Sequence, residues 1–228
     1  MQQKQIITLN KTEPVVCEYA GGCFKLSEQG VSFIGKDKDG NSMAPRWICS
    51  PLQVVAKTRD AKSGEWGRLL EWQDDDGIIH QWAMPLALLQ GDASEVRGEL
   101  ANLGLSISPN KLARDLLTTY LQVFSVESRA RCVDKLGWHE NLYVTASQTI
   151  GHSSEKIVFQ NSLTAESAMS VSGTVEDWRE SIGQLAIGNS RLVFAISAAF
   201  APALAKIAGE DSGGFHFRGA SSASKVPP

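Results

Sequence analysis

Short apolar segments separated by turn residues occupy the chain from about residue 23 to residue 84. Segments of this length, rich in β-branched and aromatic side chains, predict strands. We expect five of them, at residues 24–26, 31–34, 52–57, 68–72 and 78–82. Asp76-Gly77 separates the last two and is typical of a tight hairpin turn, because glycine accepts the positive φ that such a turn needs. The pattern predicts an antiparallel sheet, preceded by a loose arm over residues 1–22.

Helical spacing follows the strands. One helix is expected after a cap at Asp92 and ends at Gly104, and a second is expected over residues 110–124, where apolar positions recur every three or four residues. After a charged link at residues 127–131, we expect strands at 133–136, 142–145 and 156–160.

The last part of the chain reads as two helices and a short strand. The Thr174 hydroxyl is expected to cap the first helix, and Ser190 the second, which is strongly apolar and ends at Gly209. Its apolar run, residues 192–205, falls short of the roughly 20 residues that span a bilayer, so we interpret it as a buried core helix. Residues 215–218 are expected to form the strand.

Composition limits the classes of function. The 228 residues carry a formal net charge of −3, which gives no overall attraction to nucleic acid or to anionic membranes, so a nucleic-acid partner requires a local basic patch. The four cysteines form no C-x-x-C pair, and no secretory leader is evident, so a cytoplasmic protein with reduced thiols is expected. No catalytic residue and no metal site is assigned.

The last residues approach the pattern of a phosphate-binding loop, G-x-x-x-x-G-K-[ST]. Gly219 and Lys225 stand at the required spacing after the expected strand. Ser224 replaces the second glycine and Val226 replaces the residue whose hydroxyl binds Mg²⁺. The candidate nucleotide-binding residues of this degenerate loop are Gly219, Ser221, Ser222 and Lys225. A Gly/Ser-rich tail explains the same residues equally well.

Several separated blocks carry a resemblance to a known family. They are Trp47-Ile48-Cys49-Ser50-Pro51-Leu52, Trp66-Gly67-Arg68-Leu69-Leu70-Glu71-Trp72, Arg131-Cys132-Val133-Asp134-Lys135-Leu136-Gly137-Trp138-His139 and Gly173-Thr174-Val175-Glu176-Asp177-Trp178. In this order they resemble the family named domain of unknown function 927, helicase-like and primase-associated P-loop proteins carried by phages, plasmids and other mobile elements.

The resemblance implies that intact members continue through a complete phosphate-binding loop into an ATPase core that uses ATP and Mg²⁺. This sequence departs from the family at residues 223–228. The resemblance therefore implies the N-terminal, non-motor portion of a helicase-like DNA replication protein, truncated at the loop and without ATPase activity of its own. The apolar helix would then lack its intended partners and promote self-association.

Two sets of residues are candidate nucleic-acid contacts. Arg129, Arg131 and Lys135 form a basic segment, for which a solvated connector is the alternative. Tryptophans and arginines also interleave in the sheet region, where they stack bases and bind phosphates or else pack in the core; they are Trp47, Trp66, Trp72, Trp82, Arg46, Arg59 and Arg68. Asp74, Asp75 and Asp76 are read as solvent-facing turn residues, and the four histidines as surface or packed residues.

Together these patterns predict an α+β fold: a mainly antiparallel sheet with helices over residues 23–172, then a helical pair and the first strand of an incomplete P-loop domain over residues 173–228. The expected partners are single-stranded DNA or a replication protein, with no membrane and no confirmed cofactor. Two alternatives to the non-motor remnant stay open. One is a surviving binding module for single-stranded nucleic acid or a partner protein, and the other is a residual nucleotide binder that uses Gly219 to Lys225.

Overall fold

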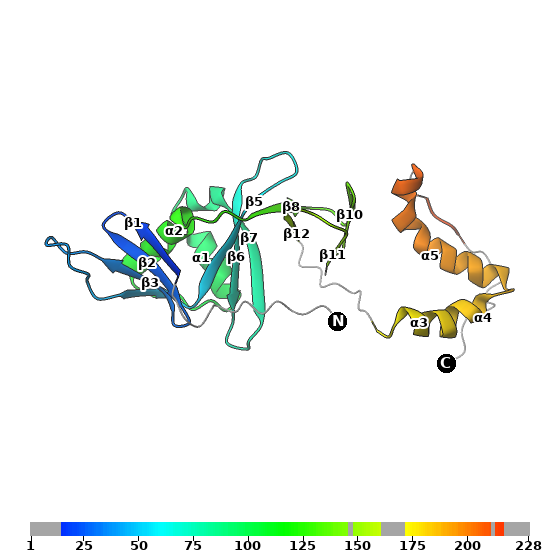
Figure 1. The fold of residues 1–228 in the computed structure, drawn as a ribbon, viewed down its shortest axis with the longest axis horizontal. Helices are drawn as coiled ribbons and strands as arrows, with labels where there is room; N and C mark the ends of the chain where they lie inside the picture. The colour runs from blue at the N-terminus through cyan, green and yellow to red at the C-terminus, as the bar shows by residue number, and fades with distance from the viewer. Residues whose placement is uncertain (1–14, 146–147, 161–171, 211–212, 217–228) are drawn as a thin grey trace. The chain divides into compact units, whose positions relative to one another are not determined.

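The computed structural model describes residues 15–145, 148–160, 172–210 and 213–216. The chain divides into two compact units, Met1–Asp134 with Ser153–Ser162 and Lys135–His152 with Leu163–Pro228. Figure 1 labels most of the helices and strands of each unit. The mixture of antiparallel sheets and helices confirms the expected α+β class. Residues 135–152 group with the later unit, although the sequence places them in the earlier domain.

A four-stranded antiparallel sheet opens the first unit. Its strands, in spatial order, are β1 (Val15–Tyr19), β2 (Gly22–Ser27), β3 (Gly30–Gly35) and β4 (Arg46–Cys49). The expectation of strands at β2 and β3 is confirmed. The expectation of a loose arm up to residue 22 is wrong over β1. This strand pairs with β2 along its whole length, and the Ala20-Gly21 turn joins the two. Backbone hydrogen bonds hold the pair together, so β1 forms without a strong hydrophobic pattern in its sequence.

A five-stranded sheet forms the rest of the unit's β structure. Its order is β12 (Lys156–Phe159), β8 (Arg129–Val133), β5 (Leu52–Arg59), β6 (Gly67–Gln73) and β7 (Ile79–Pro85). The expected strands at β5, β6, β7 and β12 are confirmed. The charged link expected at residues 127–131 is wrong, because β8 begins at Arg129 and pairs in parallel with both β5 and β12.

Side chains join the two outer strands of this sheet. Lys156 Nζ on β12 donates to Gln81 Oε1 on β7 at 3.2 Å, and Gln160 Nε2 donates to the Ala83 carbonyl at 2.8 Å. The sheet must therefore curl so that its edges meet. The concave side encloses a cluster of small and apolar residues: Ala56, Leu69, Ala83 and Ala130.

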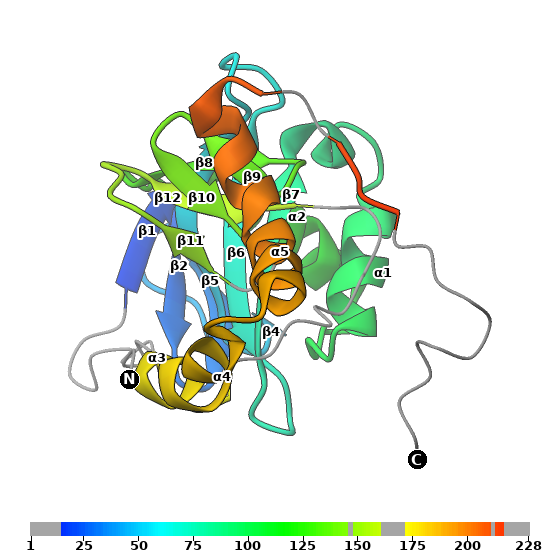
Figure 2. The same cartoon turned by 90° about the vertical axis from the view of Figure 1, so that its right-hand side faces the viewer.

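The main core lies between the two sheets and the helices. After the short 3₁₀ helix η1 (Leu86–Leu89) come α1 (Ser94–Asn102) and α2 (Lys111–Val123), which lie together on one side of β6 and β7 (Figure 2). Asn110 Oδ1 accepts the amide hydrogens of Leu112 and Ala113 and so caps α2, close to the expected start. Tyr120 is fully buried, and its hydroxyl donates to the Leu52 carbonyl at 2.7 Å.

The second unit begins with a small antiparallel sheet. Its strands are β9 (Gly137–His139), β10 (Leu142–Val144) and β11 (Thr149–Ile150), in the order β11-β10-β9. The expected strand at 142–145 is confirmed. The strand expected at 133–136 is wrong, because β8 already ends at Val133 and β9 begins only at Gly137, whose φ of 103° favours glycine.

Helices complete the second unit. They are α3 (Val175–Trp178), a π-helical stretch η2 (Arg179–Gly183), α4 (Gln184–Ala186) and α5 (Ser190–Ala208). The cap at Thr174 is confirmed, with Asp177 completing a capping box, whereas α5 is capped by Asn189 rather than by Ser190. Gly209 ends α5 at a φ of 71°. The expected strand is wrong at Phe215 and His216, which are not extended in a sheet, and its remainder lies outside the described residues.

The interpretation of α5 as a buried core helix is wrong for the structure described. None of its residues is buried, and by length and composition alone it could cross a membrane. The Ala203 carbonyl accepts from Trp138 Nε1 at 2.6 Å, and Lys206 Nζ donates to the Trp138 carbonyl at 2.9 Å. Phe200 packs edge-on against Trp178, and Phe194 packs edge-on against Phe215, yet the large apolar side chains of the helix stay exposed.

Candidate nucleic-acid interface

Three positively charged residues form a row across three neighbouring strands of the five-stranded sheet. Lys57 on β5 lies directly opposite Arg68 on β6 and directly opposite Arg129 on β8. Directly paired residues point to the same face of a sheet, so the three side chains share one face. We call Arg68, Lys57 and Arg129 the cation row. Like charges in this arrangement repel and do not stabilise the sheet, so the row needs another explanation.

A β-bulge places the row on its face. The pairing between β5 and β6 shifts between Val54 and Ala56, so that Val54 pairs with Leu70 and Ala56 pairs with Leu69. The extra residue reverses which side chains point to the helix-covered face. Lys57 consequently shares the face of Leu70 and Trp72, next to the end of α2, where the Gln122 carbonyl lies.

The Arg68 guanidinium is incompletely satisfied. Its Nη2 donates to the Gln122 carbonyl at 2.9 Å, while its buried Nε and Nη1 have no hydrogen-bond partner. Burial lowers the pKa of Arg68 from its ordinary value, because removing the charge from water disfavours the cation. Buried N–H groups normally have acceptors, and the oxygens of carboxylates and phosphates are the acceptors that a guanidinium binds most strongly.

Lys57 and Arg129 have no acidic partner within the described residues, and Arg129 is exposed to solvent. The neighbouring pair on the same face behaves differently. Arg59 lies opposite Arg131, and its guanidinium donates to both carboxylate oxygens of Glu155, at 2.9 and 2.7 Å. Glu155 therefore neutralises Arg59, whereas no described acidic side chain pairs with the cation row.

The structure brings together some of the residues that the sequence singled out. Arg129 and Arg131 lie two positions apart on β8 and share a face with Arg59 and Arg68. Lys135 belongs to the second unit and is not part of the row. Gly219, Ser221, Ser222 and Lys225 lie outside the described residues, so their role stays a prediction. Sequence reasoning missed Lys57, because only the observed pairing of β5 with β6 and β8 places it between Arg68 and Arg129.

The four tryptophans of the sheet region divide into two pairs. Trp72 is buried and donates to the Leu103 carbonyl at 3.0 Å, and Trp82 packs against the main core, so core packing is confirmed for both. Trp47 and Trp66 remain exposed, at 42% and 43%. Each indole N–H is nevertheless satisfied, by the Gln29 carbonyl in Trp47 and by the Ser63 carbonyl in Trp66.

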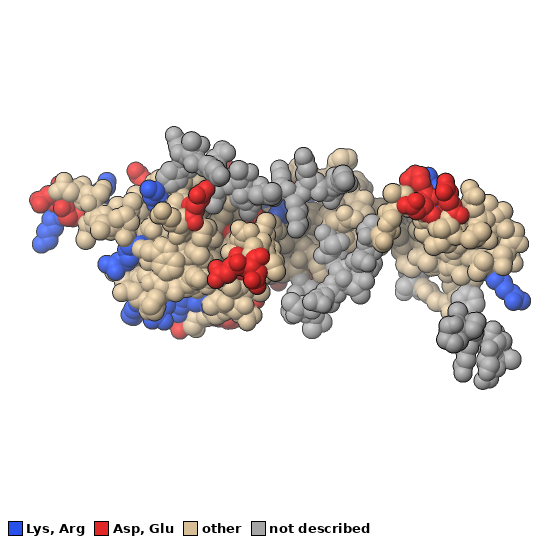
Figure 3. Space-filling view, turned by 90° about the horizontal axis from the view of Figure 1, so that it is seen from below, with Lys and Arg blue, Asp and Glu red and all other residues tan. Residues whose placement is uncertain are grey.

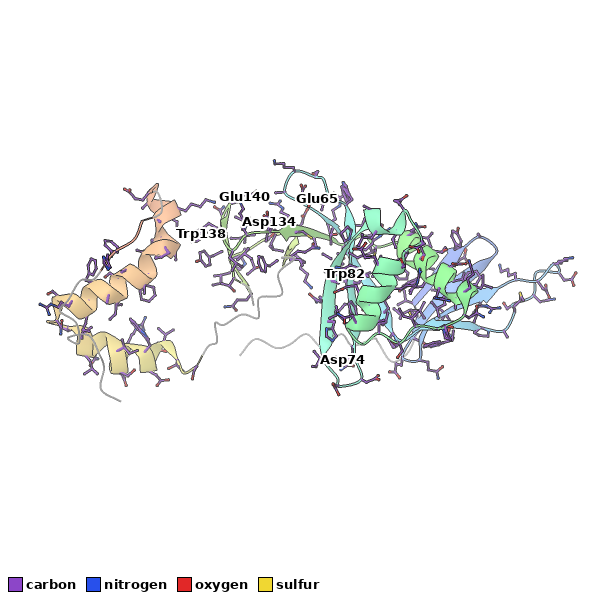
Figure 4. The ribbon with its side chains drawn as sticks, turned by 180° about the vertical axis from the view of Figure 1, so that it is seen from behind. Glu65, Asp74, Trp82, Asp134, Trp138 and Glu140 are labelled. Carbon is purple, nitrogen blue, oxygen red and sulfur yellow. The ribbon has the colours of Figure 1, made fainter. Side chains whose placement is uncertain are left out.

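The acidic turn between β6 and β7 has a structural role. Asp75 and Asp76 face solvent as expected, but that expectation is wrong for Asp74, which is half-buried. Asp74, which Figure 4 labels, accepts the amide hydrogens of Asp76 and Ile78, and His80 Nε2 donates to it at 2.8 Å. These bonds lower the pKa of Asp74, with the His80 bond contributing most. Across the described residues, no group of three histidine, cysteine or acidic side chains could hold a metal ion.

Comparisons with known proteins agree with this architecture. The family described as Domain of unknown function (DUF927) matches residues 24–226. A solved structure described as "SCCmec type IV Cch - active helicase" shares the fold, with a TM-score of 0.52 and 16% sequence identity. The similarity covers 86% of this chain but 36% of that one, so this chain spans about a third of the other protein's length. No curated protein matches the chain.

Proposed function

The chain belongs to the family described as Domain of unknown function (DUF927), and from this premise and the cation row we propose that it is a nucleic-acid-binding, non-motor portion of a helicase-like DNA replication protein of mobile elements. The fold that it shares with a chain described as an active helicase supports the helicase-like part of the proposal. That protein extends well beyond the third of its length that this chain matches.

The observation that carries the proposal is the unpaired charge of the cation row. Three cations lie directly opposite one another on adjacent strands, and two buried N–H groups of Arg68 lack acceptors. A polynucleotide supplies a line of phosphates, which would relieve the repulsion and satisfy the guanidinium together. Because the chain as a whole carries a net charge of −3, it has no overall attraction to nucleic acid. The affinity for nucleic acid would therefore depend on these few residues.

A binding experiment with charge-removing variants tests the proposal. Fluorescence anisotropy would follow a labelled 20-nucleotide strand over a series of salt concentrations. We expect Lys57→Ala/Arg129→Ala to weaken binding and to flatten the salt dependence by about 1.4 in slope, because each lost phosphate contact in a single strand removes about 0.7. Lys25→Ala and Arg114→Ala remove comparable charges elsewhere in the same unit and should leave the slope unchanged. Equal slopes in all variants would refute the proposal.

The proposal also includes the absence of ATP hydrolysis by this chain alone. It follows from the degenerate loop, in which Ser224 and Val226 replace the glycine and the metal-binding hydroxyl residue. The competing function, a residual nucleotide binder, uses Gly219 to Lys225. Labelled ATP that binds to the wild-type chain but not to Lys225→Ala would favour the competing function.

A further inference from the structure

We infer that Trp66 is a base-stacking platform beside the cation row, and that the ligand of this face is consequently single-stranded nucleic acid. The inference rests on the proposed function and adds to it the form of the ligand. In a single strand the bases are free to stack on an aromatic ring, whereas in a duplex they are already stacked on each other.

The position of Trp66 follows from the pairing of β6. Gly67 begins the strand, and the Trp66 carbonyl still accepts the Leu86 amide hydrogen at 3.0 Å, so the extended backbone continues through Trp66. Side chains two positions apart in an extended segment point to the same side, about 6.6 Å from each other along the strand. Trp66 therefore stands on the same side as Arg68, at the end of the cation row.

The indole ring of Trp66 is held in place but not covered. Its N–H donates to the Ser63 carbonyl at 2.9 Å, while 43% of the residue remains exposed. The N–H is the only polar group of the indole ring, and it is already bonded. The exposed part of the ring is therefore an apolar face held in a fixed orientation, on which a nucleic-acid base can stack.

An acidic residue, Glu65, is the sequence neighbour of Trp66. Glu65 precedes Trp66 in the loop between β5 and β6 (Figure 4). Among the described residues, no ion pair joins Glu65 to Arg68, Lys57 or Arg129.

The test compares Trp66→Ala with Trp47→Ala. Trp47 is a matched control, because its exposure is 42%, its indole N–H is also bonded to a carbonyl, and it lies in the other sheet of the unit. Both variants and the wild-type chain are titrated at one low salt concentration with oligothymidine and with an abasic oligomer of equal length. Trp66→Phe is included because it keeps an aromatic ring and checks that the loop still folds.

We expect Trp66→Ala to bind oligothymidine at least about fivefold more weakly, since the loss of one stacked base costs about 1 kcal/mol or more. Binding to the abasic oligomer should not change, and Trp66→Phe should recover part of the loss. Trp47→Ala should behave as the wild type does.

Two other outcomes separate the inference from the proposed function. If Trp66→Ala binds oligothymidine as tightly as Trp47→Ala does, while the Lys57/Arg129 variant is weakened, the stacking platform is refuted and the proposed function stands. If the wild-type chain shows no salt-dependent binding to either oligomer, both are refuted.

Discussion

Arg68 is a residue at which binding and stability are expected to oppose each other. Two of its nitrogens are buried without hydrogen-bond partners, which costs free energy in the folded state. Arg68→Met keeps much of the volume and removes the charge and the unsatisfied N–H groups. We expect this variant to have an equal or higher free energy of unfolding in urea and a weaker affinity for oligonucleotides. A marked loss of stability would show that Arg68 serves the fold instead.

Asp74 is expected to contribute to stability in a pH-dependent way. Its pKa is lowered because His80 and two backbone N–H groups bond to the carboxylate. A carboxyl group of this kind stabilises the folded state above its ordinary pKa, near 3.9, and loses that contribution as the pH falls through its lowered value. Asp74→Asn should therefore lower the urea midpoint at pH 6–7 and differ less from the wild type near pH 3.

The exposed neighbour Asp75 provides the control for that measurement. Asp75→Asn removes the same charge from the same turn, but Asp75 faces solvent and makes no described hydrogen bond through its side chain. Its urea midpoints should follow those of the wild type at every pH. If both variants changed the midpoint by the same amount, the effect would belong to the charge of the turn and not to the bonds of Asp74.

At the scale of elements, strand β5 explains why part of the site could not be predicted. Simple alternation puts Lys57 and Arg59 on the face opposite Leu52 and Val54. The bulge at Val55 reverses that assignment, and no residue pattern around Val55 predicts a bulge there. The parallel pairing of β8 with β5 joins residues about 70 positions apart along the chain, so a local sequence pattern cannot predict it either.

Other elements could be predicted from the sequence, because the residues that determine them lie close together along the chain. The cap at Asn110 and the apolar spacing of α2 define that helix, and Asp76-Gly77 defines the turn between β6 and β7, with Gly77 at a φ of 80°. Trp47 and Trp66 could be recognised as candidates but not separated from Trp72 and Trp82. Exposure distinguishes the two pairs, and exposure depends on packing between distant segments.

Helix α5 carries a prediction of its own. Its large apolar side chains are exposed, including Phe200 at 56%, Leu204 at 57% and Ile207 at 65%, and acidic side chains of this unit gather elsewhere, on α3 and η2 (Figure 3). A helix that is apolar on most sides tends to be covered by another apolar surface. We expect the purified chain to self-associate with rising concentration in sedimentation velocity experiments.

Substitutions on one side of α5 test that expectation. Leu204→Gln/Ile207→Gln replaces two exposed residues three positions apart and should shift the chain toward the monomer. Leu112→Gln is the control, because Leu112 is 51% exposed on α2 of the first unit. A wild-type chain that stays monomeric and binds no apolar dye would contradict the prediction.

At the scale of the whole molecule, the two units differ in how much of their apolar surface is buried. The first unit holds both main sheets, the buried core and the cation row, while the second consists of a small sheet and helices with extensive exposed apolar surface. The proposed nucleic-acid binding therefore resides in the first unit. The phosphate-binding residues predicted at 219–225 lie outside the described part of the chain, so their role stays a prediction.

The most direct test of the proposed function is the salt dependence of oligonucleotide binding by the wild-type chain and by Lys57→Ala/Arg129→Ala. We predict that the logarithm of the association constant falls linearly with the logarithm of salt concentration for the wild type, and less steeply for the variant. Absence of binding at low salt, or identical slopes for the two proteins, would contradict the assignment of nucleic-acid binding to the cation row.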